Sequence, residues 1–321
     1  MNKFVPVIIS LTVTALILLF VNAVSNNNPS LANPNEQTPA IKENLLPAEK
    51  TTGDDESKFV QQIHSILIPQ KLSFAGESVP LDEPDVKERM DRELLVNSYW
   101  HSSTIQLFKL AHKFFPVIEP ILKKNGVPDD IKYVALIESG LRNLVSPQDA
   151  TGIWQFLDET GENFGLEINS EVDERYHLEK STEAACKYFL EAYGRFESWT
   201  LAAASYNMGM QGLENTMERQ KANNYYDLFL RDETSRYIFR IIAVKEIFEN
   251  AQTYGYLIDE SEKYNFVPYK VVTVDTAISD LASFAIDQGI NYKNLKLLNE
   301  WLRSSSLTNK SGKSYEIKIR Q

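Results

Sequence analysis

The middle of the chain carries apolar residues at the spacing of a helix. Asp82 and Pro84 are residue types that open helices, and Val86, Met90 and Leu94 then recur at intervals of four. Side chains at this interval share one helix face, which packs toward a core. Helical spacing and helix-opening residues are frequent through the middle of the sequence, so we expect this region to be all-α.

The alternation typical of β-strands occurs only near the C-terminus. It is found in Tyr269–Val274 (YKVVTV) and in the residues from Tyr315 to Ile319 (YEIKI), with two stretches of helical period between them. This order predicts a small β-α-α-β module. The predicted fold class is mainly α, with a helical domain and N-terminal helical extension over residues 58–255 and the module over 267–321.

The N-terminal residues differ in character from the rest of the chain. No charged side chain lies between Phe4 and Ser25, an apolar run close to the roughly 20 residues that span a bilayer. Val21-Asn22-Ala23 resembles a signal-peptide cleavage site, so we expect residues 1–25 to be either a signal peptide or a membrane anchor of an exported protein. No cysteine follows the run, which excludes a lipoprotein anchor there. Residues 26–57 have few large apolar side chains and are predicted to be a flexible tether.

Composition excludes several classes of function. The 321 residues include 33 Lys and Arg against 44 Asp and Glu, a formal charge of -11, so we do not expect nucleic acid as a partner. The single cysteine, Cys186, excludes an intramolecular disulfide, and the four histidines lack metal-ligand spacing. Nucleotide-binding glycine motifs and GxSxG do not occur. We therefore expect no cofactor and no metal, and a chemistry of carboxylates, amides and hydroxyls.

One helical segment places a carboxylate where an apolar side chain belongs. The segment starts at Pro128, followed by two acids, and stops at Gly140, as helix ends prefer. Ile131 and Val134 lie on its inward stripe, and Glu138 occupies a later position on that stripe. A Glu at this place is protonated, paired with a base, facing a wet cleft, or bent to solvent. A protonated Glu is what a general acid requires.

Further motifs accompany Glu138 in a fixed order. They are Ser146-Pro147, Thr151-Gly152-Ile153-Trp154-Gln155-Phe156, Ala203-Ala204-Ser205-Tyr206-Asn207-Met208-Gly209 and Glu233-Thr234-Ser235-Arg236-Tyr237. Together with the Glu138-Ser139 pair, this set resembles the catalytic domain of family 1 lytic transglycosylases, of the membrane-bound lytic murein transglycosylase D type, over residues 75–250. The resemblance implies a lysozyme-like helical fold that acts on the glycan strands of bacterial peptidoglycan.

The resemblance also implies roles for individual residues. Glu138 matches the catalytic acid and base of the family. The residues that match substrate-contacting positions are Ser146, Gln155, Tyr206, Asn207 and Tyr237. Amides suit the binding of N-acetyl groups and tyrosine hydroxyls can orient Glu138, but Ser146 can equally cap a turn and Asn207 can end a helix. Met208 stands where the family has alanine and adds bulk beside the Tyr-Asn pair.

The motifs present one carboxylate, whereas ordinary glycosidases use two. Asp149, Asp158 and Glu159 lie nearby but are interpreted as loop and first-turn acids. The resemblance implies that Glu138 protonates the bond between N-acetylmuramic acid and N-acetylglucosamine, and that the muramic C6 hydroxyl closes on C1 to a 1,6-anhydro product. A lysozyme-class muramidase and a non-catalytic cell-wall binding scaffold remain as alternatives. The tryptophans expected in the core rather than as sugar platforms are Trp100, Trp154 and Trp199.

The C-terminal module resembles a divergent LysM module, a peptidoglycan-binding unit. The resemblance rests on the residues from Val271 to Thr276 and from Leu295 to Leu302. Val274 stands where the module usually has glycine, so a lid on the catalytic domain is the alternative role. The family context implies a location on the periplasmic side of the cell envelope, with glycan strands as the partner and anchoring to the inner membrane if residues 1–25 are retained.

Overall fold

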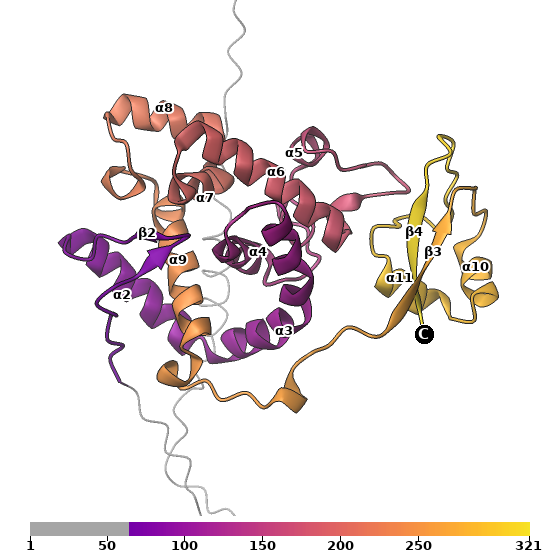
Figure 1. The fold of residues 1–321 in the computed structure, drawn as a ribbon, viewed down its shortest axis with the longest axis horizontal. Helices are drawn as coiled ribbons and strands as arrows, with labels where there is room; N and C mark the ends of the chain where they lie inside the picture. The colour runs from indigo at the N-terminus through magenta and orange to yellow at the C-terminus, as the bar shows by residue number, and fades with distance from the viewer. Residues whose placement is uncertain (1–63) are drawn as a thin grey trace, which may run out of the picture. The chain divides into compact units, whose positions relative to one another are not determined.

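The computed structural model describes residues 64–321, so the predicted signal peptide or anchor and the tether lie outside the described residues. Helices make up most of this range, and a two-stranded sheet with two helices ends it (Figure 1). The predicted fold class is confirmed. Within residues 64–321, no helix combines the length and the apolar character needed to cross a membrane.

The helical part follows a small hairpin of β1 (Ser73–Phe74) and β2 (Glu77–Ser78). Its α-helices are α2 (Pro84–Tyr99), α3 (His101–Lys124), α4 (Lys132–Ser139), α5 (Asp158–Asn163), α6 (Leu178–Phe196), α7 (Trp199–Met208), α8 (Met210–Gln220) and α9 (Asp232–Glu249). The 3-10 turns are η1 (Asp129–Ile131), η2 (Glu174–Tyr176), η3 (Tyr225–Asp227), η4 (Ala251–Tyr254) and η5 (Glu260–Glu262).

Local sequence explains the first two long helices. Pro84 occupies the first turn of α2, and the predicted stripe of Val86, Met90 and Leu94 is buried. The next helix, α3, contains Pro116 and Pro120 in its interior. A proline inside a helix removes a backbone hydrogen bond and favours a bend. In Figure 1, α3 curves around α4, the helix that carries Glu138.

The C-terminal module has the predicted β-α-α-β order. Its elements are β3 (Tyr269–Val274), α10 (Leu281–Asp287), α11 (Tyr292–Leu298) and β4 (Tyr315–Arg320). The two strands are antiparallel, with Tyr269 opposite Arg320 and Val274 opposite Tyr315. The module has a hydrophobic core of its own, which includes Leu281, Trp301 and Ile317, separate from the larger core of the helical part.

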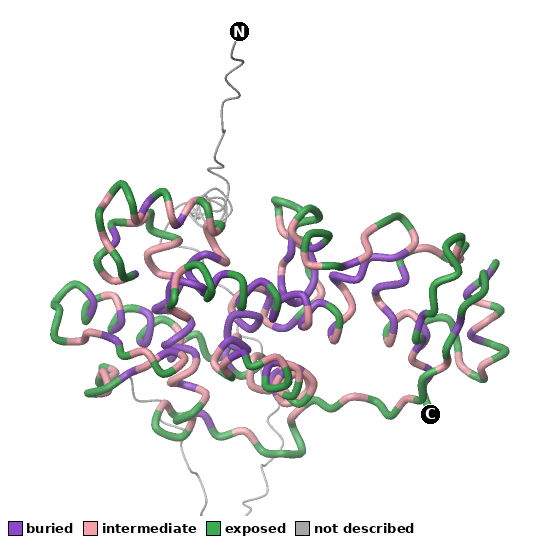
Figure 2. The backbone as a smooth tube through the Cα atoms, turned by 45° about the horizontal axis from the view of Figure 1, so that its top comes forward, coloured by how far each residue is buried: buried purple, intermediate pink, exposed green. Residues whose placement is uncertain are grey.

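Buried positions follow the inner faces of the helices, and exposed positions mark their outer turns (Figure 2). Trp154 is completely buried, as predicted, and its indole N–H donates to the Thr182 hydroxyl at 2.9 Å. Trp199 is half-buried and stacks on Tyr193 at 4.2 Å between ring centroids. The prediction for Trp100 was wrong, because this side chain is 61% exposed at the junction of α2 and α3.

Candidate active site

The helix α4 carries Glu138 on the stripe where the sequence places it. Ile131 and Val134 are completely buried, and Glu138, further along the same stripe, is half-buried. Gly140 ends the helix in the left-handed conformation, with φ 61°. A Cβ atom at Gly140 would lie 3.3 Å from the Cδ2 methyl of the Leu107 side chain, so it is the left-handed conformation of the turn after Glu138 that favours glycine.

The surroundings of Glu138 favour its neutral form. Burial raises the pKa of this carboxyl above its ordinary value. The Tyr237 hydroxyl donates a hydrogen bond to Oε1 and lowers the pKa, as does the positive charge of Arg240, whereas the charge of Glu233 raises it. The net direction is upward. A carboxyl with a raised pKa remains protonated to higher pH, which suits a general acid.

Two tyrosines from different helices lie beside Glu138. Tyr237 belongs to α9 and Tyr206 to α7. Burial raises the pKa of both phenols well above the ordinary value, and the charge of Glu138 raises them further, so both remain hydrogen-bond donors. Tyr237 donates to Glu138 itself, and Tyr206 donates to the carbonyl oxygen of Trp154 at 2.7 Å. Three of the six predicted site residues are therefore brought together.

The loop between α4 and α5 contains two more predicted residues, and both stabilise the loop itself. The Ser146 hydroxyl oxygen accepts hydrogen bonds from the backbone N–H groups of Gln148 and Ala150, at 3.2 and 3.0 Å. This is the turn-capping role that the sequence left open for Ser146. The Gln155 amide nitrogen donates to the carbonyl oxygens of Leu144 and Gly152, at 3.1 and 2.7 Å.

Asn207 differs from these loop residues because its amide makes no hydrogen bond within the described part of the chain. It lies in the last turn of α7, next to Met208 and Gly209. Its side chain is half-buried and makes no hydrogen bond to any residue of the range 64–321. The amide is therefore available to a ligand.

Two residues near Glu138 make contacts that the motifs did not predict, although Ser139 is part of the Glu138-Ser139 pair. The Ser139 hydroxyl is buried and donates to the Ile153 carbonyl oxygen at 2.7 Å, which ties the end of α4 to the loop. Arg240 donates to the Ile137 carbonyl oxygen at 3.4 Å and lies three residues after Tyr237 on α9. Helical spacing from Tyr237 could have identified Arg240, because residues three apart share a face.

The acids considered as a second carboxylate are in the predicted kinds of position. Asp158 and Glu159 are in the first turn of α5, and Asp149 is an exposed loop residue. Asp158 also forms an ion pair with Arg175. These contacts give Asp158 a structural partner and leave Glu138 as the carboxyl with a raised pKa beside the two tyrosines.

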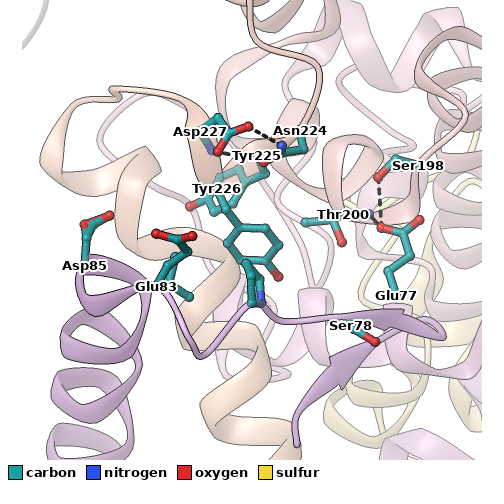
Figure 3. Close-up of a pocket in the computed structure, with 12 residues that line it drawn as sticks. Glu77, Ser78, Glu83, Asp85, Ser198, Thr200, Asn224, Tyr225, Tyr226 and Asp227 are labelled. Carbon is teal, nitrogen blue, oxygen red and sulfur yellow. Dashed lines mark hydrogen bonds between the residues drawn. The ribbon is translucent and has the colours of Figure 1, made fainter.

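A cavity of about 430 Å³ is lined by a different set of residues (Figure 3). Its lining includes the acids Glu77, Glu83, Asp85 and Asp227. Glu77 accepts hydrogen bonds from the Ser198 hydroxyl at 2.8 Å and the Thr200 backbone N–H at 2.9 Å, at the start of α7. The carboxylate thereby fixes the β1-β2 hairpin to the N-terminus of α7, where negative charge is favourable. None of the predicted site residues lines this cavity.

Comparisons with known proteins find similarity in two segments of the chain. Residues 115–229 match the family model described as the Transglycosylase SLT domain, and residues 270–321 match the Soluble lytic transglycosylase C-terminal LysM-like domain. The membrane-bound lytic murein transglycosylases D of Escherichia coli K12 and of Escherichia coli O6:H1 are each 26% identical to the chain over 244 residues. The match covers 73% of this chain and 52% of each relative, so the chain spans about half the length of these relatives. One segment of the chain is therefore similar to a transglycosylase SLT domain, and a later segment is similar to a LysM-like domain of the soluble lytic transglycosylase type.

Proposed function

We propose that the protein is a peptidoglycan lytic transglycosylase with Glu138 as its catalytic acid and base. The observation that carries the proposal is the half-buried Glu138 of raised pKa, which accepts a hydrogen bond from Tyr237. Glu138 lies within the part of the chain that matches the SLT domain, residues 115–229. The names of the two relatives support murein as the substrate class.

The proposed reaction needs one carboxyl and no water. Protonated Glu138 donates its proton to the glycosidic oxygen between N-acetylmuramic acid and N-acetylglucosamine, and the bond from that oxygen to C1 of the muramic residue breaks. The ionised Glu138 then removes the proton of the muramic C6 hydroxyl as this oxygen bonds to C1. The carboxyl is neutral again, and the products are a 1,6-anhydromuramic end and a free N-acetylglucosamine hydroxyl. Proton transfer of this kind contributes about 10² to 10⁴-fold in rate.

The polar residues around Glu138 have distinct proposed roles. Tyr237 orients Glu138 and stabilises its ionised form through the hydrogen bond to Oε1. The Asn207 amide, which no residue of 64–321 uses, is suited to an N-acetyl group. Ser146 and Gln155 act mainly by shaping the loop that lines the proposed site, and Tyr206 fixes that loop to α7.

We further propose a location in the cell envelope on its periplasmic side. The apolar residues 1–25 support export, either as a signal peptide or as an inner-membrane anchor. The proposed domain ranges are 58–255 for the transglycosylase domain and 267–321 for the LysM-like module, and the two family matches fall inside these ranges.

The test is digestion of purified peptidoglycan by the purified protein, followed by mass spectrometry of the muropeptides. A transglycosylase gives products lighter by one water than the hydrolytic products, and Glu138→Gln should abolish them. Gln keeps the size of Glu138 and can still accept the hydrogen bond from Tyr237, so loss of products would be chemical rather than structural.

Two other outcomes would replace the proposal. Reducing-end products would identify a muramidase, with a second carboxylate or an activated water. Wild-type protein that binds peptidoglycan without cleaving it would identify a binding scaffold, and Glu138→Gln would then bind equally well.

A further inference from the structure

The LysM-like module packs against the helical part of the chain at a short segment that precedes η2. Val172 in this segment is 1% exposed and belongs to the hydrophobic core of the module. It forms a β-bridge with Leu302 of the module. On either side of Val172, the Asp173 N–H donates to the Trp301 carbonyl oxygen at 2.9 Å, and the Glu171 carbonyl oxygen accepts from a module N–H at 2.7 Å. A residue of the helical part thus completes the core of the module.

Charged contacts surround this bridge, with acids on the transglycosylase domain and cationic or polar groups on the module. Glu179 pairs with Lys318 at 2.5 Å, and Glu167 pairs with Lys313 at 2.9 Å. Arg303 lies over the ring of Tyr176, 3.9 Å from its centroid. The contact therefore combines a buried apolar residue, backbone hydrogen bonds and complementary charge, which is the composition of a specific interface.

The same segment fixes the loop of the proposed active site on its other side. Arg175 is 7% exposed, and its guanidinium donates to both carboxylate oxygens of Asp173, at 2.9 and 2.6 Å. It also donates to the carbonyl oxygens of Asp149 and Phe156, both at 3.3 Å, and pairs with Asp158. Asp173 is thus bonded to the module through its N–H and to Arg175 through its side chain.

The loop held by Arg175 is the loop on which the proposed site depends. Its Ile153 carbonyl oxygen accepts from Ser139, next to Glu138, and its Trp154 carbonyl oxygen accepts from Tyr206. Gln155 is part of the same loop. Only one residue separates Asp173, which contacts the module, from Arg175, which contacts the loop.

We infer that the docked LysM-like module positions the active-site loop, residues 149–158, through Val172, Asp173 and Arg175. The module is then part of the substrate site's architecture in addition to any affinity for glycan. In this role Arg175 is a positioning residue. The effect on substrate binding rests on the proposed function, whereas the mechanical link between module and loop does not.

The test is hydrogen exchange of the full-length protein with Val172→Asp, which places a charge in the core of the module. The Asp173 and Arg303 amides report docking, and the Thr151, Gly152 and Phe156 amides report the loop. We expect loss of protection at both sets, with a rise of roughly 2- to 30-fold in the exchange rate of the loop. Leu297→Asp, at a position 60% exposed on α11, is the matched control and should change neither set.

Steady-state kinetics with soluble glycan fragments are a second test of the inference. The variant should raise KM while the pH dependence of kcat stays unchanged, because the hydrogen bond from Tyr237 to Glu138 joins α9 to α4 and involves no residue of the loop. Undocking without loss of protection in residues 149–158 would overturn the inference.

Where Val172→Asp unfolds the protein, Lys318→Glu weakens the same contact by opposing two carboxylates and leaves both cores intact. If the wild type does not cleave glycan, the proposed function is wrong. The hydrogen-exchange data still test whether the module positions residues 149–158.

Discussion

At the scale of single residues, Glu138 gives the folded protein a pH dependence whose sign follows from its raised pKa. Its folded-state pKa lies above the unfolded value of about 4.3, so the folded state binds this proton more tightly. The stability that this provides is fully present below pH of about 4.3 and is lost as the pH rises through the folded-state pKa. Glu138→Gln never ionises and should therefore become more stable relative to the wild type as the pH rises toward neutrality.

Thermal unfolding of wild type and variant across this pH range measures the difference. Glu159→Gln, at an exposed position in the first turn of α5, serves as the control and should show no such trend. A difference between wild type and Glu138→Gln that stays constant from acidic to neutral pH would contradict a raised pKa.

Tyr237 tunes the same carboxyl, and its hydroxyl can be removed by Tyr237→Phe. A hydrogen bond to a charged group is worth about 1.5–3 kcal/mol, so we expect turnover to fall roughly 10- to 100-fold. The hydrogen bond lowers the pKa of Glu138, so its loss raises that pKa and moves the alkaline limb of the kcat/KM profile to higher pH. Assays of kcat/KM against pH test both effects.

Tyr256→Phe is the matched control for this prediction, because the Tyr256 hydroxyl also donates a buried hydrogen bond, to the Ser98 carbonyl oxygen at 2.6 Å. It should leave the pH profile in place. An identical profile for Tyr237→Phe and the wild type would show that Tyr237 does not act on Glu138.

At the scale of elements, the loop between α4 and α5 is fixed by a close backbone contact. Gly152 has φ 84°, and a Cβ atom there would lie 2.1 Å from the Arg175 carbonyl oxygen. Because the clash is with backbone, Gly152→Ala must displace the loop, and we expect a loss of at least about 2 kcal/mol in the free energy of unfolding. Gly255→Ala, with φ 80° and open space, should lose only about 1 kcal/mol. Urea unfolding compares them, and equal losses would mean that the contact with Arg175 is unimportant.

The helices and strands whose apolar residues follow a regular spacing could be predicted from the sequence. The stripe of α4 located Glu138, and alternation located β3 together with β4, apart from the final residue of β4. The prediction for Trp100 failed because residue type does not determine which side of a helix junction faces the core. For Ser146, a single sequence allowed both a loop role and a substrate role, and its backbone contacts favour the first.

Contacts between distant segments could not be predicted in this way. Val172 stands among polar residues, and nothing in its local pattern indicates that it enters the core of a module at the other end of the chain. Arg175 likewise belongs to none of the motifs, although it bonds to Asp173, Asp158 and two loop carbonyls. Periodicity describes which face of an element is buried but not which partner buries it.

At the scale of the whole molecule, the described residues form two hydrophobic cores. An ion pair between Glu179 and Lys318 joins the two parts and makes their contact sensitive to acid. Burial alone would raise the pKa of Glu179, but the neighbouring His177 ring, 3.2 Å from the carboxylate, and the hydrogen bond and charge of Lys318 hold it at about 2. Lys318 belongs to β4 of the module, whereas Glu179 and His177 belong to the helical part of the chain. The ion pair therefore favours docking only while Glu179 is ionised.

The sign of the effect is opposite to that at Glu138. The folded-state pKa of Glu179 is depressed, so its contribution is present above the unfolded pKa of about 4.3 and is lost as the pH falls toward about 2. Glu179→Gln should lower stability by an amount on the order of 2 kcal/mol near neutral pH, after allowance for solvent screening, and the difference should shrink below pH of about 4. Glu183→Gln on the same helix removes a pair with the exposed Lys124 and should cost less than about 1 kcal/mol. Denaturant unfolding at a series of pH values measures both losses. Equal losses in the two variants would mean that Glu179 contributes no more than an ordinary surface acid. A larger loss for Glu179→Gln that shrinks in acid would show that acid weakens the contact between the two cores.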